Sequence, residues 1–537
     1  MEHVDRVENK NVKITKEQWI QFIALVFGAF VAIEAMVFQA PAIPAIAQAF
    51  EIPTSLSGLI VVSFYVMSAA FYPVTGRLAD QFGRRKIILI GMVIFAFSEY
   101  GAALSPTYSF LLSMRALQGI AVACIFPVVI AYIGVIFPPE KRGFASGIFN
   151  GFQGIASMTG AAVAGILITK YGWPIIYWVG GTLAVAGFFA IFFFVKESKG
   201  ESKAGFDIPG IILIFIATAC LISISTLVEV FGLTSSITLG AVVVGVSAAI
   251  ALWFVENKVE RPIMELSLLR NRIYTLIVII YLINIAAMQL YIYTMNFFLS
   301  LRPGGDAAES GFFFFFVYFA GVIGGLIAGT LSDRVNNKRL LFTVLVFPFI
   351  ALIINAQISY DISFTNVALI AFLFGIGSSV PILIKLGVNV IPPEKYGAGS
   401  GLLAFIRDFG VPFGSITGIV TFSSMSANAT QSALVNNART AGIDNDLMGD
   451  LQEAAMTNGE TISTSLSEKL QSLGVSFEQL MLQASGEGIT FAVNNLSYIG
   501  AGLFLLLIIL TLFIPGPKKE KLKKTIHEKE EMVEQTN

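Results

Sequence analysis

Apolar segments of about 20 residues recur along most of this 537-residue chain. A helix of about 20 residues crosses the roughly 30 Å hydrocarbon core of a membrane. Only 13% of the residues are charged, about half the fraction that is usual in soluble domains. The segments lie at about 19–40, 56–75, 87–105, 108–136, 144–169, 173–195, 207–228, 235–256, 273–299, 311–330, 340–358, 364–390, 398–422 and 491–514. They predict an all-α polytopic membrane protein with fourteen spans, and they disfavour a soluble enzyme, a nucleic-acid binder and a disordered chain.

The distribution of lysine and arginine predicts the orientation of the spans. With both termini in the cytoplasm, 27 of the 34 basic residues fall in cytoplasmic segments, four fall outside and three lie within spans. Cytoplasmic loops of membrane proteins carry such an excess of positive charge. We therefore expect cytoplasmic termini and an external segment at 423–490, where two amphipathic helices over the external mouth and a solvated loop are equally favoured.

Two cytoplasmic motifs occur twice, at nearly one offset. The segment 76–86 (GRLADQFGRRK) matches 329–339 (GTLSDRVNNKR) at an offset of 253 residues. The segment 137–147 (FPPEKRGFASG) matches 391–401 (IPPEKYGAGSG) at an offset of 254. Paired repeats around a site near the bilayer midplane are typical of secondary transporters. We infer two six-helix bundles with spans 7 and 8 inserted between them.

The domain limits follow from this division. They are a cytoplasmic N-terminus at 1–18, an N-terminal bundle at 19–195, the inserted spans with linkers at 196–272, a C-terminal bundle at 273–514 with the insert 423–490, and a cytoplasmic tail at 515–537.

These motifs resemble those of a known transporter family. The segment 76–86 is similar to the signature loop of the major facilitator superfamily, and 112–119 (LSMRALQG) is similar to its fourth-span motif. Fourteen spans and the linker at 256–272 resemble the fourteen-span drug/proton antiporters, including quaternary-ammonium exporters. The resemblance implies the major facilitator fold and alternating access of the two bundles around a central cavity.

The resemblance also assigns a gating role to the repeated loop. In the family, the acid that corresponds to Asp80 braces the outward-open state against neighbouring helices. Ordinary anchoring of the loop by its positive charges is the alternative. The expected gating residues are Gly76, Asp80, Gly83, Arg84, Arg85 and Asp333.

One acid and one base within the N-terminal spans are candidates for coupling. A charge at the bilayer centre costs roughly 2.5–3.5 kcal/mol, so intramembrane charges are expected to face a partner or a cavity. Glu34 in span 1 and Arg115 in span 4 lie on helices that run in opposite directions, and they are predicted to share a depth. The resemblance ties them to cation recognition and proton coupling, and a static ion pair is the alternative.

A second set of intramembrane charges lies in span 13, at Arg407 and Asp408. Adjacent residues of a helix point about 100° apart, so we expect each to find another partner or water. Some quaternary-ammonium exporters have an acid at a position like Asp408. Burial in a cavity would raise the pKa of this carboxyl group, as proton coupling requires. Asp408 is therefore the best candidate for a titrating or cation-binding acid.

Several polar residues are weaker candidates. Gln118, Asn150 and Gln153 are predicted to line the cavity or to form hydrogen bonds between helices. Glu99, in the outer third of span 3, is expected to reach towards the headgroups.

The predicted function is proton-coupled export of hydrophobic, cationic compounds, as in multidrug efflux and antibiotic resistance. Span 5 lacks the proline of the antiporter motif and reads GAAVAG at 160–165, which keeps a proton symporter (an importer) open. The sequence is also compatible with a transporter or flippase of a lipid or amphipathic metabolite, and with a transport-inactive sensor.

No cofactor other than a proton gradient is expected. The sequence contains no Gly-x-x-x-x-Gly-Lys-Ser/Thr motif for a nucleotide, and Cys124 and Cys220 have no metal-site spacing. The expected partners are a small hydrophobic or cationic substrate, protons and membrane lipids, with no nucleic acid. We expect a monomer in a bacterial cell membrane.

Overall fold

The computed structural model describes residues 14–199, 208–259, 265–332, 334–392, 395–457 and 462–515. Within these ranges the regular structure is entirely helical, and fourteen of the helices are long and apolar enough to cross a membrane. The predicted all-α architecture with fourteen spans is therefore confirmed. Asp333 and the tail beyond residue 515 lie outside the described residues, as do the side chains of Glu34 and Asn150 within their helices.

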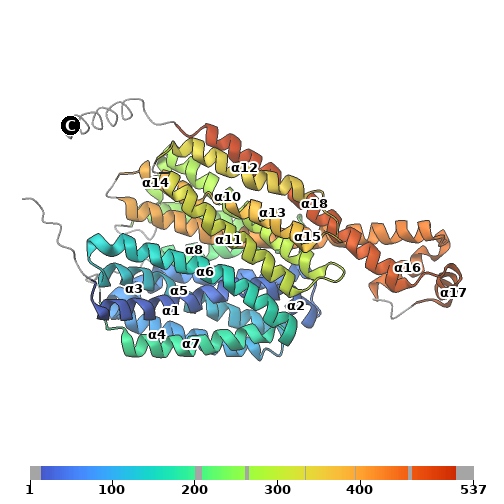
Figure 1. Cartoon of the computed structure of the whole chain (residues 1–537), viewed down its shortest axis with the longest axis horizontal. Coiled ribbons are helices and arrows are strands. Elements are labelled where there is room, and N and C mark those ends of the chain that lie inside the picture. The colour runs from blue at the N-terminus through green and yellow to red at the C-terminus, as the bar shows by residue number, and fades with distance from the viewer. Residues whose placement is uncertain are drawn as a thin grey trace, which may run out of the picture.

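The spans form two bundles that lie side by side (Figure 1). The N half contains α1 (Lys16–Val37), α2 (Gln39–Ala49), the short helix η1 (Thr54–Gly58), α3 (Leu59–Phe82), α4 (Arg84–Ala103), α5 (Tyr108–Ile136), α6 (Pro139–Tyr171) and α7 (Pro174–Phe194). The C half contains α10 (Arg272–Leu301), α11 (Ala307–Leu331), α12 (Asn337–Asn355), α13 (Phe364–Ile376), α14 (Val380–Asn389), α15 (Tyr396–Ala441) and α18 (Phe477–Leu512). Each half thus has six spans, as the repeat predicts.

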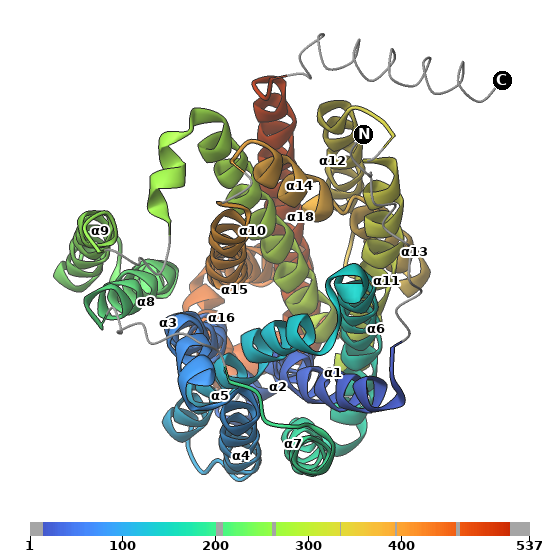
Figure 2. The same ribbon diagram turned by 90° about the vertical axis from the view of Figure 1, so that its left-hand side faces the viewer.

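The two inserted spans, α8 (Ile208–Phe231) and α9 (Ser236–Glu256), lie at the periphery of the bundle (Figure 2). Helix α8 packs against α3 of the N half and α15 of the C half, and α9 packs against α8. The hydroxyl groups of Ser225 and Thr417 form a 3.0 Å hydrogen bond between α8 and α15. The inserted pair therefore covers one side of the junction between the halves.

Small residues allow the closest approaches between helices. A Cβ atom on Gly414 would lie 2.2 Å from the carbonyl oxygen of Ala286, so α15 packs directly on the backbone of α10. Likewise, a Cβ atom on Gly165 would lie 2.4 Å from the carbonyl oxygen of Ala307, where α6 of the N half meets α11 of the C half. Lipid provides no hydrophobic drive for association, so such close backbone packing stabilises the bundle.

The fourth span of each half contains a proline at the same repeat position, but only one of these spans is broken. Pro127 lies inside the continuous helix α5, whereas Pro381 follows a break at 377–379 between α13 and α14. Proline leaves the carbonyl group four residues earlier without its helical donor. In the N half, the Thr75 hydroxyl donates to that carbonyl, at Ala123, over 2.6 Å. The repeat places Ala328, which has no hydroxyl, at the corresponding position of α11.

Residues 423–490, expected to be either helical or a solvated loop, are mostly helical where the structure describes them. Helices α15 and α18 extend well beyond their predicted spans, and α16 (Met448–Met456) and α17 (Thr464–Leu473) lie between them. Gly442, with φ of 91°, ends α15 in the left-handed conformation that glycine adopts without strain. The four helices share a small core that includes Leu434, Leu451, Leu466 and Leu480.

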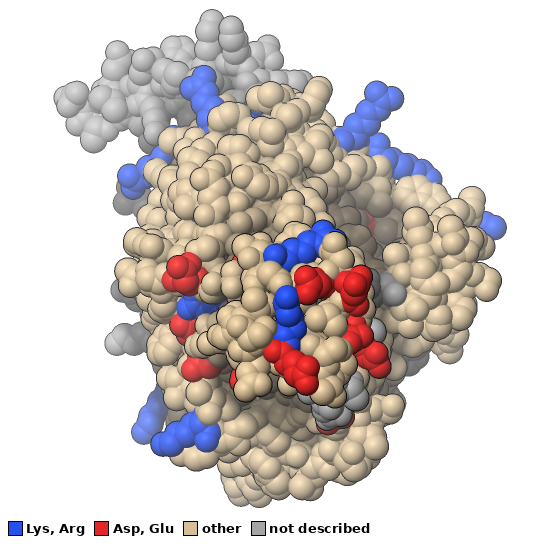
Figure 3. All heavy atoms as spheres, turned by 90° about the vertical axis from the view of Figure 1, so that its right-hand side faces the viewer, with Lys and Arg blue, Asp and Glu red and all other residues tan. Residues whose placement is uncertain are grey.

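This group of helices, which we call the extension, projects away from the bundle at the end opposite the start of α1 and the end of α18 (Figure 1). The prediction that its helices lie over the mouth of the bundle was wrong. The continuous helices α15 and α18 carry the extension outward, because their apolar core continues beyond the spans. Acidic side chains gather on its far surface (Figure 3).

Candidate functional site

The two charges of α15 form an ion pair with one another. The Arg407 Nε atom lies 2.9 Å from the Asp408 Oδ1 atom, and a second guanidinium nitrogen lies 2.9 Å from the same oxygen. The prediction that neighbouring helical residues could not pair was wrong. Their Cβ atoms diverge, but the arginine side chain is long enough to fold back onto the adjacent carboxylate.

The pair lies between the two halves of the bundle. Asp408 is buried, whereas Arg407 exposes 40% of its side chain, although both lie well inside a span. Tyr72 of α3 and Tyr281 of α10 lie within electrostatic range of both charges. An intramembrane carboxylate therefore contacts a guanidinium group that other side chains cover only partly.

The charged cluster of the N half is enclosed. Arg115 and Gln118 of α5 are both buried, and the Arg115 guanidinium donates a hydrogen bond to the Gln118 side-chain oxygen. The Arg115 guanidinium also stacks 4.6 Å from the centre of the Phe64 ring. Whether Glu34 pairs with Arg115 stays a prediction, because the Glu34 side chain is outside the described residues.

Glu99 of α4 belongs to this cluster, which we call the N-half cluster (Glu99, Arg115 and Gln118). Its side chain is only 3% exposed, and a Cβ atom on Gly180 would lie 2.6 Å from its Oε2 atom. Its charge acts on Arg115. The prediction that Glu99 reaches the headgroups was wrong, because α7 covers this face of α4. The position of Glu99 in the sequence predicts its depth in the membrane, but it does not predict which helix packs on it.

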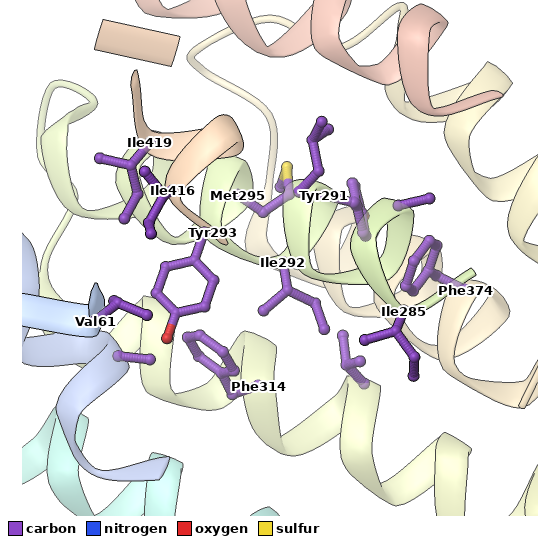
Figure 4. Packing of buried hydrophobic residues seen from close by; sticks show 14 of the residues in the cluster. Val61, Ile285, Tyr291, Ile292, Tyr293, Met295, Phe314, Phe374, Ile416 and Ile419 are labelled. Atoms are coloured by element: carbon purple, nitrogen blue, oxygen red, sulfur yellow. The ribbon is translucent and has the colours of Figure 1, made fainter. Parts of the chain in front are cut away.

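Two tyrosines lie between the N-half cluster and the ion pair of α15. Tyr65 of α3 and Tyr293 of α10 are within electrostatic range of each other and of Arg115, and Tyr65 is also within range of Asp408. Figure 4 shows Tyr293 projecting from α10 beside Val61 of α3 and Phe314 of α11. Phenol side chains from both halves therefore lie within electrostatic range of Arg115, and the Tyr65 phenol also lies within range of Asp408. No motif or charge pattern in the sequence marks these tyrosines.

The predicted gating loop packs against its own half. Asp80 forms a 2.8 Å ion pair with Arg84, whose backbone N–H donates to the carbonyl of Ser198 over 2.8 Å. The Arg85 backbone N–H donates to the Glu197 carboxylate over 3.1 Å. Gly83 has a φ of 116°, and a Cβ atom there would lie 2.5 Å from the same carboxylate.

The remaining candidates are placed as follows. A Cβ atom on Gly76 would have open space around it. Gln153 is half-buried on α6, next to Gly154, where a Cβ atom would lie 2.6 Å from the Val322 side chain of α11. The gating role of the loop and the cavity-lining role of Asn150 and Gln153 stay predictions.

Two hydrogen bonds join the halves at the end that carries the extension. The Asn296 side-chain amide donates to the carbonyl of Ala40 over 2.8 Å. The Ala308 backbone N–H donates to the Thr169 hydroxyl over 3.1 Å. Together with the contact between Gly165 and Ala307, they hold α2 and α6 against α10 and α11 at this end.

The family follows from comparison with known proteins. The model of the Major Facilitator Superfamily matches residues 25–415. This chain belongs to the Major Facilitator Superfamily. Its two six-helix halves are arranged as in a membrane transporter. The superfamily is a family of transporters and not a family of enzymes.

The matches to two curated relatives cover most of the length of each relative. Multidrug resistance protein 3 of Bacillus subtilis is 25% identical over 66% of this chain and 70% of the relative. The riboflavin transporter RibZ of Clostridioides difficile is 27% identical over 74% of this chain and 87% of the relative.

Among solved structures, a bacterial homologue of the human lysosomal transporter Spinster, in an inward-facing and unoccupied conformation, superposes with a TM-score of 0.62. The match covers 93% of this chain and 98% of the solved chain at 14% identity. At this identity the likeness shows the fold alone.

Proposed function

We propose that this transporter exports hydrophobic cationic compounds in exchange for protons. The observation that carries the proposal is the pair of Arg407 and Asp408, in which a buried carboxylate contacts a partly exposed guanidinium between the halves. Intramembrane acids in transporters commonly mark ion pathways and proton relays. Relatives named for multidrug resistance in Bacillus subtilis and Mycobacterium tuberculosis support the substrate class.

In this mechanism, three species compete for the Asp408 carboxylate: the Arg407 guanidinium, a cationic substrate and a proton. A cation that binds the carboxylate displaces Arg407, and protonation then removes the negative charge that holds the cation. A ligand shifts a conformational equilibrium only by its differential affinity for the two states. Proton and substrate must therefore favour opposite states, and Asp408 is the group through which we expect both to act.

Replacing Asp408 tests the proposal. In proteoliposomes with an imposed pH gradient, we expect Asp408→Asn to reduce efflux of ethidium at least about tenfold, which corresponds to about 1.4 kcal/mol. Asp361→Asn is the matched control, because Asp361 is exposed in the loop between α12 and α13. Gradient-driven efflux by Asp408→Asn at the rate of the unchanged protein would contradict the proposal.

The direction of transport is tested separately. An antiporter releases protons from the vesicle lumen as substrate enters, whereas a symporter takes protons in together with substrate. We expect a substrate-induced pH change with the sign of exchange. The opposite sign would make the protein an importer.

The riboflavin relative supports a second candidate, transport of a neutral planar metabolite. Such a substrate needs aromatic stacking and hydrogen bonds but no carboxylate. Riboflavin transport that persists in Asp408→Asn, together with absence of ethidium transport by the unchanged protein, would favour this second function.

A further inference from the structure

A groove of about 590 Å³ lies between the end of α12 and the start of α13. Its volume is within the range of sites for small molecules. Apolar side chains, including Ile354, Leu369 and Leu373, line most of it. Gln357, Ser359 and Asn366 provide its polar lining. This groove belongs to neither charged group described above.

The groove opens towards the membrane rather than the space between the halves. Helices α12 and α13 pack against each other and against α11, α14 and α18, all of which are in the C half. Both lie at the outer edge of the bundle (Figure 2). Ile354 and Leu369, on facing sides of the groove, are 47% and 64% exposed. Exposed apolar side chains at this position contact lipid chains.

Apolar side chains line the groove along its whole length, whereas its polar side chains lie at one end. Gln357 and Ser359 follow the last residue of α12, and Asn366 lies in the first turn of α13. Leu373 lies nine residues after the start of α13, or about 14 Å deeper at 1.5 Å per residue. Half of a hydrocarbon core is about 15 Å thick. The groove therefore spans one leaflet, with its polar end at the interface.

The polar end is held in place and offers hydrogen-bond donors. Arg302 is 8% exposed, pairs with both carboxylate oxygens of Glu309 and donates to the carbonyl of Ile362 over 2.7 Å. These bonds fix the loop between α12 and α13 while neutralising the buried charge. Within the described part of the chain, the side-chain amides of Gln357 and Asn366 form no hydrogen bond, so they can donate to a ligand.

Charge at the mouth indicates which headgroup fits. The groove has no charged lining residue among those described. The Ser359 hydroxyl binds the carboxylate of Asp361, which is exposed beside the mouth. That carboxylate repels an anionic headgroup and attracts an ammonium group.

We propose that this groove binds a zwitterionic glycerophospholipid from the leaflet on the extension side. One acyl chain lies along Ile354, Leu369 and Leu373, and an ester carbonyl accepts hydrogen bonds from Gln357 or Asn366. The ammonium of a phosphatidylethanolamine headgroup faces Asp361. The proposal is independent of the substrate and of the proton coupling proposed above.

Photo-crosslinking tests the site. The full chain is placed in nanodiscs that contain phosphatidylethanolamine with a diazirine on one acyl chain, and labelled peptides are identified by mass spectrometry. We expect the label to concentrate on residues 353–373 and to fall at least about fivefold in Leu373→Trp, which fills the groove. Ile350→Trp is the matched control, because Ile350 is 43% exposed on α12 and is not a lining residue.

A second variant and a second probe keep the test decisive. Asn366→Leu removes a donor without adding bulk, and we expect it to weaken labelling while the melting temperature in detergent stays unchanged. Labelling spread evenly over 353–373 and the lipid-facing helix α9 would overturn the site. Equal labelling by a diazirine phosphatidylglycerol would overturn the headgroup assignment. Loss of labelling when ethidium is added at its transport concentrations would overturn the lipid site and make the groove a substrate path instead.

Discussion

Glu99 and Arg115, intramembrane charged residues of the N half, are enclosed, whereas Arg407 of the C half is partly exposed between the halves. Glu99, Arg115 and Gln118 are each no more than 3% exposed, but Arg407 exposes 40% of its side chain. A proton can reach a group only through a path that water or a partner provides. We therefore expect the C-half pair to take part in transport and the N-half cluster to hold the helices around it.

The repeat relates the two halves position by position. With its offset of 254 residues, Gln153 and Gly154 of α6 occupy the repeat positions that correspond to Arg407 and Asp408 of α15. Gly154 lets α6 pack closely on Val322 of α11, whereas Asp408 puts a carboxylate at the corresponding junction of α15 with α3. The same repeat position therefore holds a glycine that allows close helix packing in the N half and a charged side chain in the C half.

The largest difference in the free energy of unfolding is expected between two variants, each of which removes the intramembrane arginine of one half. Arg115→Ala leaves the buried side-chain oxygen of Gln118 without its guanidinium donor, and losing a buried hydrogen bond to a charged group costs about 1.5–3 kcal/mol. Arg407→Ala should cost less, about 1–2 kcal/mol, because water can replace its guanidinium group. Reversible unfolding in mixed micelles measures both. Equal losses would mean that the two halves bury their charges alike.

A double-mutant cycle on Glu99 and Arg115 tests the N-half cluster directly. We expect Glu99→Ala with Arg115→Ala to be less destabilising than the sum of the single changes, with a coupling of about 1–3 kcal/mol. In contrast to Asp408→Asn, Glu99→Gln should leave the pH dependence of transport unchanged. A shifted pH profile would assign a proton-carrying role to the N half and remove the functional difference between the halves.

A smaller effect on stability is expected in the fourth span of the N half, where a hydroxyl group compensates for the proline. Thr75→Val removes the hydroxyl that binds the Ala123 carbonyl, and a buried carbonyl without a donor costs about 1–2 kcal/mol. Thr330→Val is the matched control, because Thr330 is exposed and its hydroxyl bonds only within its own helix. The unfolding free energies of the two variants should differ. If they agree, the hydroxyl does not explain why α5 stays continuous.

The smallest effect is expected at the repeated Pro-Pro-Glu-Lys motif. Lys395 and Ser267 donate hydrogen bonds to Glu265, and they hold the pKa of that carboxyl below its usual value. A lowered pKa in the folded state stabilises the protein above the unfolded pKa of about 4.3, and the stabilisation is lost as pH falls through the folded value.

Because Glu265 and Lys395 are both partly exposed, the contribution should stay below about 1 kcal/mol. The melting temperature of Glu265→Gln, measured from pH 7 down to pH 3, should approach that of the unchanged protein at the acidic end. A constant difference across this range would assign the effect to something other than ionisation. Lys141→Met, at the corresponding position of the N half, is the control.

The fourteen spans, their grouping into two halves and the depth of each intramembrane charge could all be predicted from the sequence alone. Hydrophobic length is set by the bilayer, and a repeat preserves its offset, so both can be recognised in a single chain. The small-residue contacts of Gly165 and Gly414 could also be predicted, because close helix packing requires particular residues at particular spacings.

The neighbours that each charge meets depend on tertiary packing. Depth along a helix is a local property, but burial depends on the helix that covers each face. Glu99 is enclosed because α7 packs over it, and Asp408 contacts Arg407 because the arginine side chain folds back. The break after α13 likewise depends on a second helix, since Thr75 supplies in the N half a donor that Ala328 cannot supply in the C half.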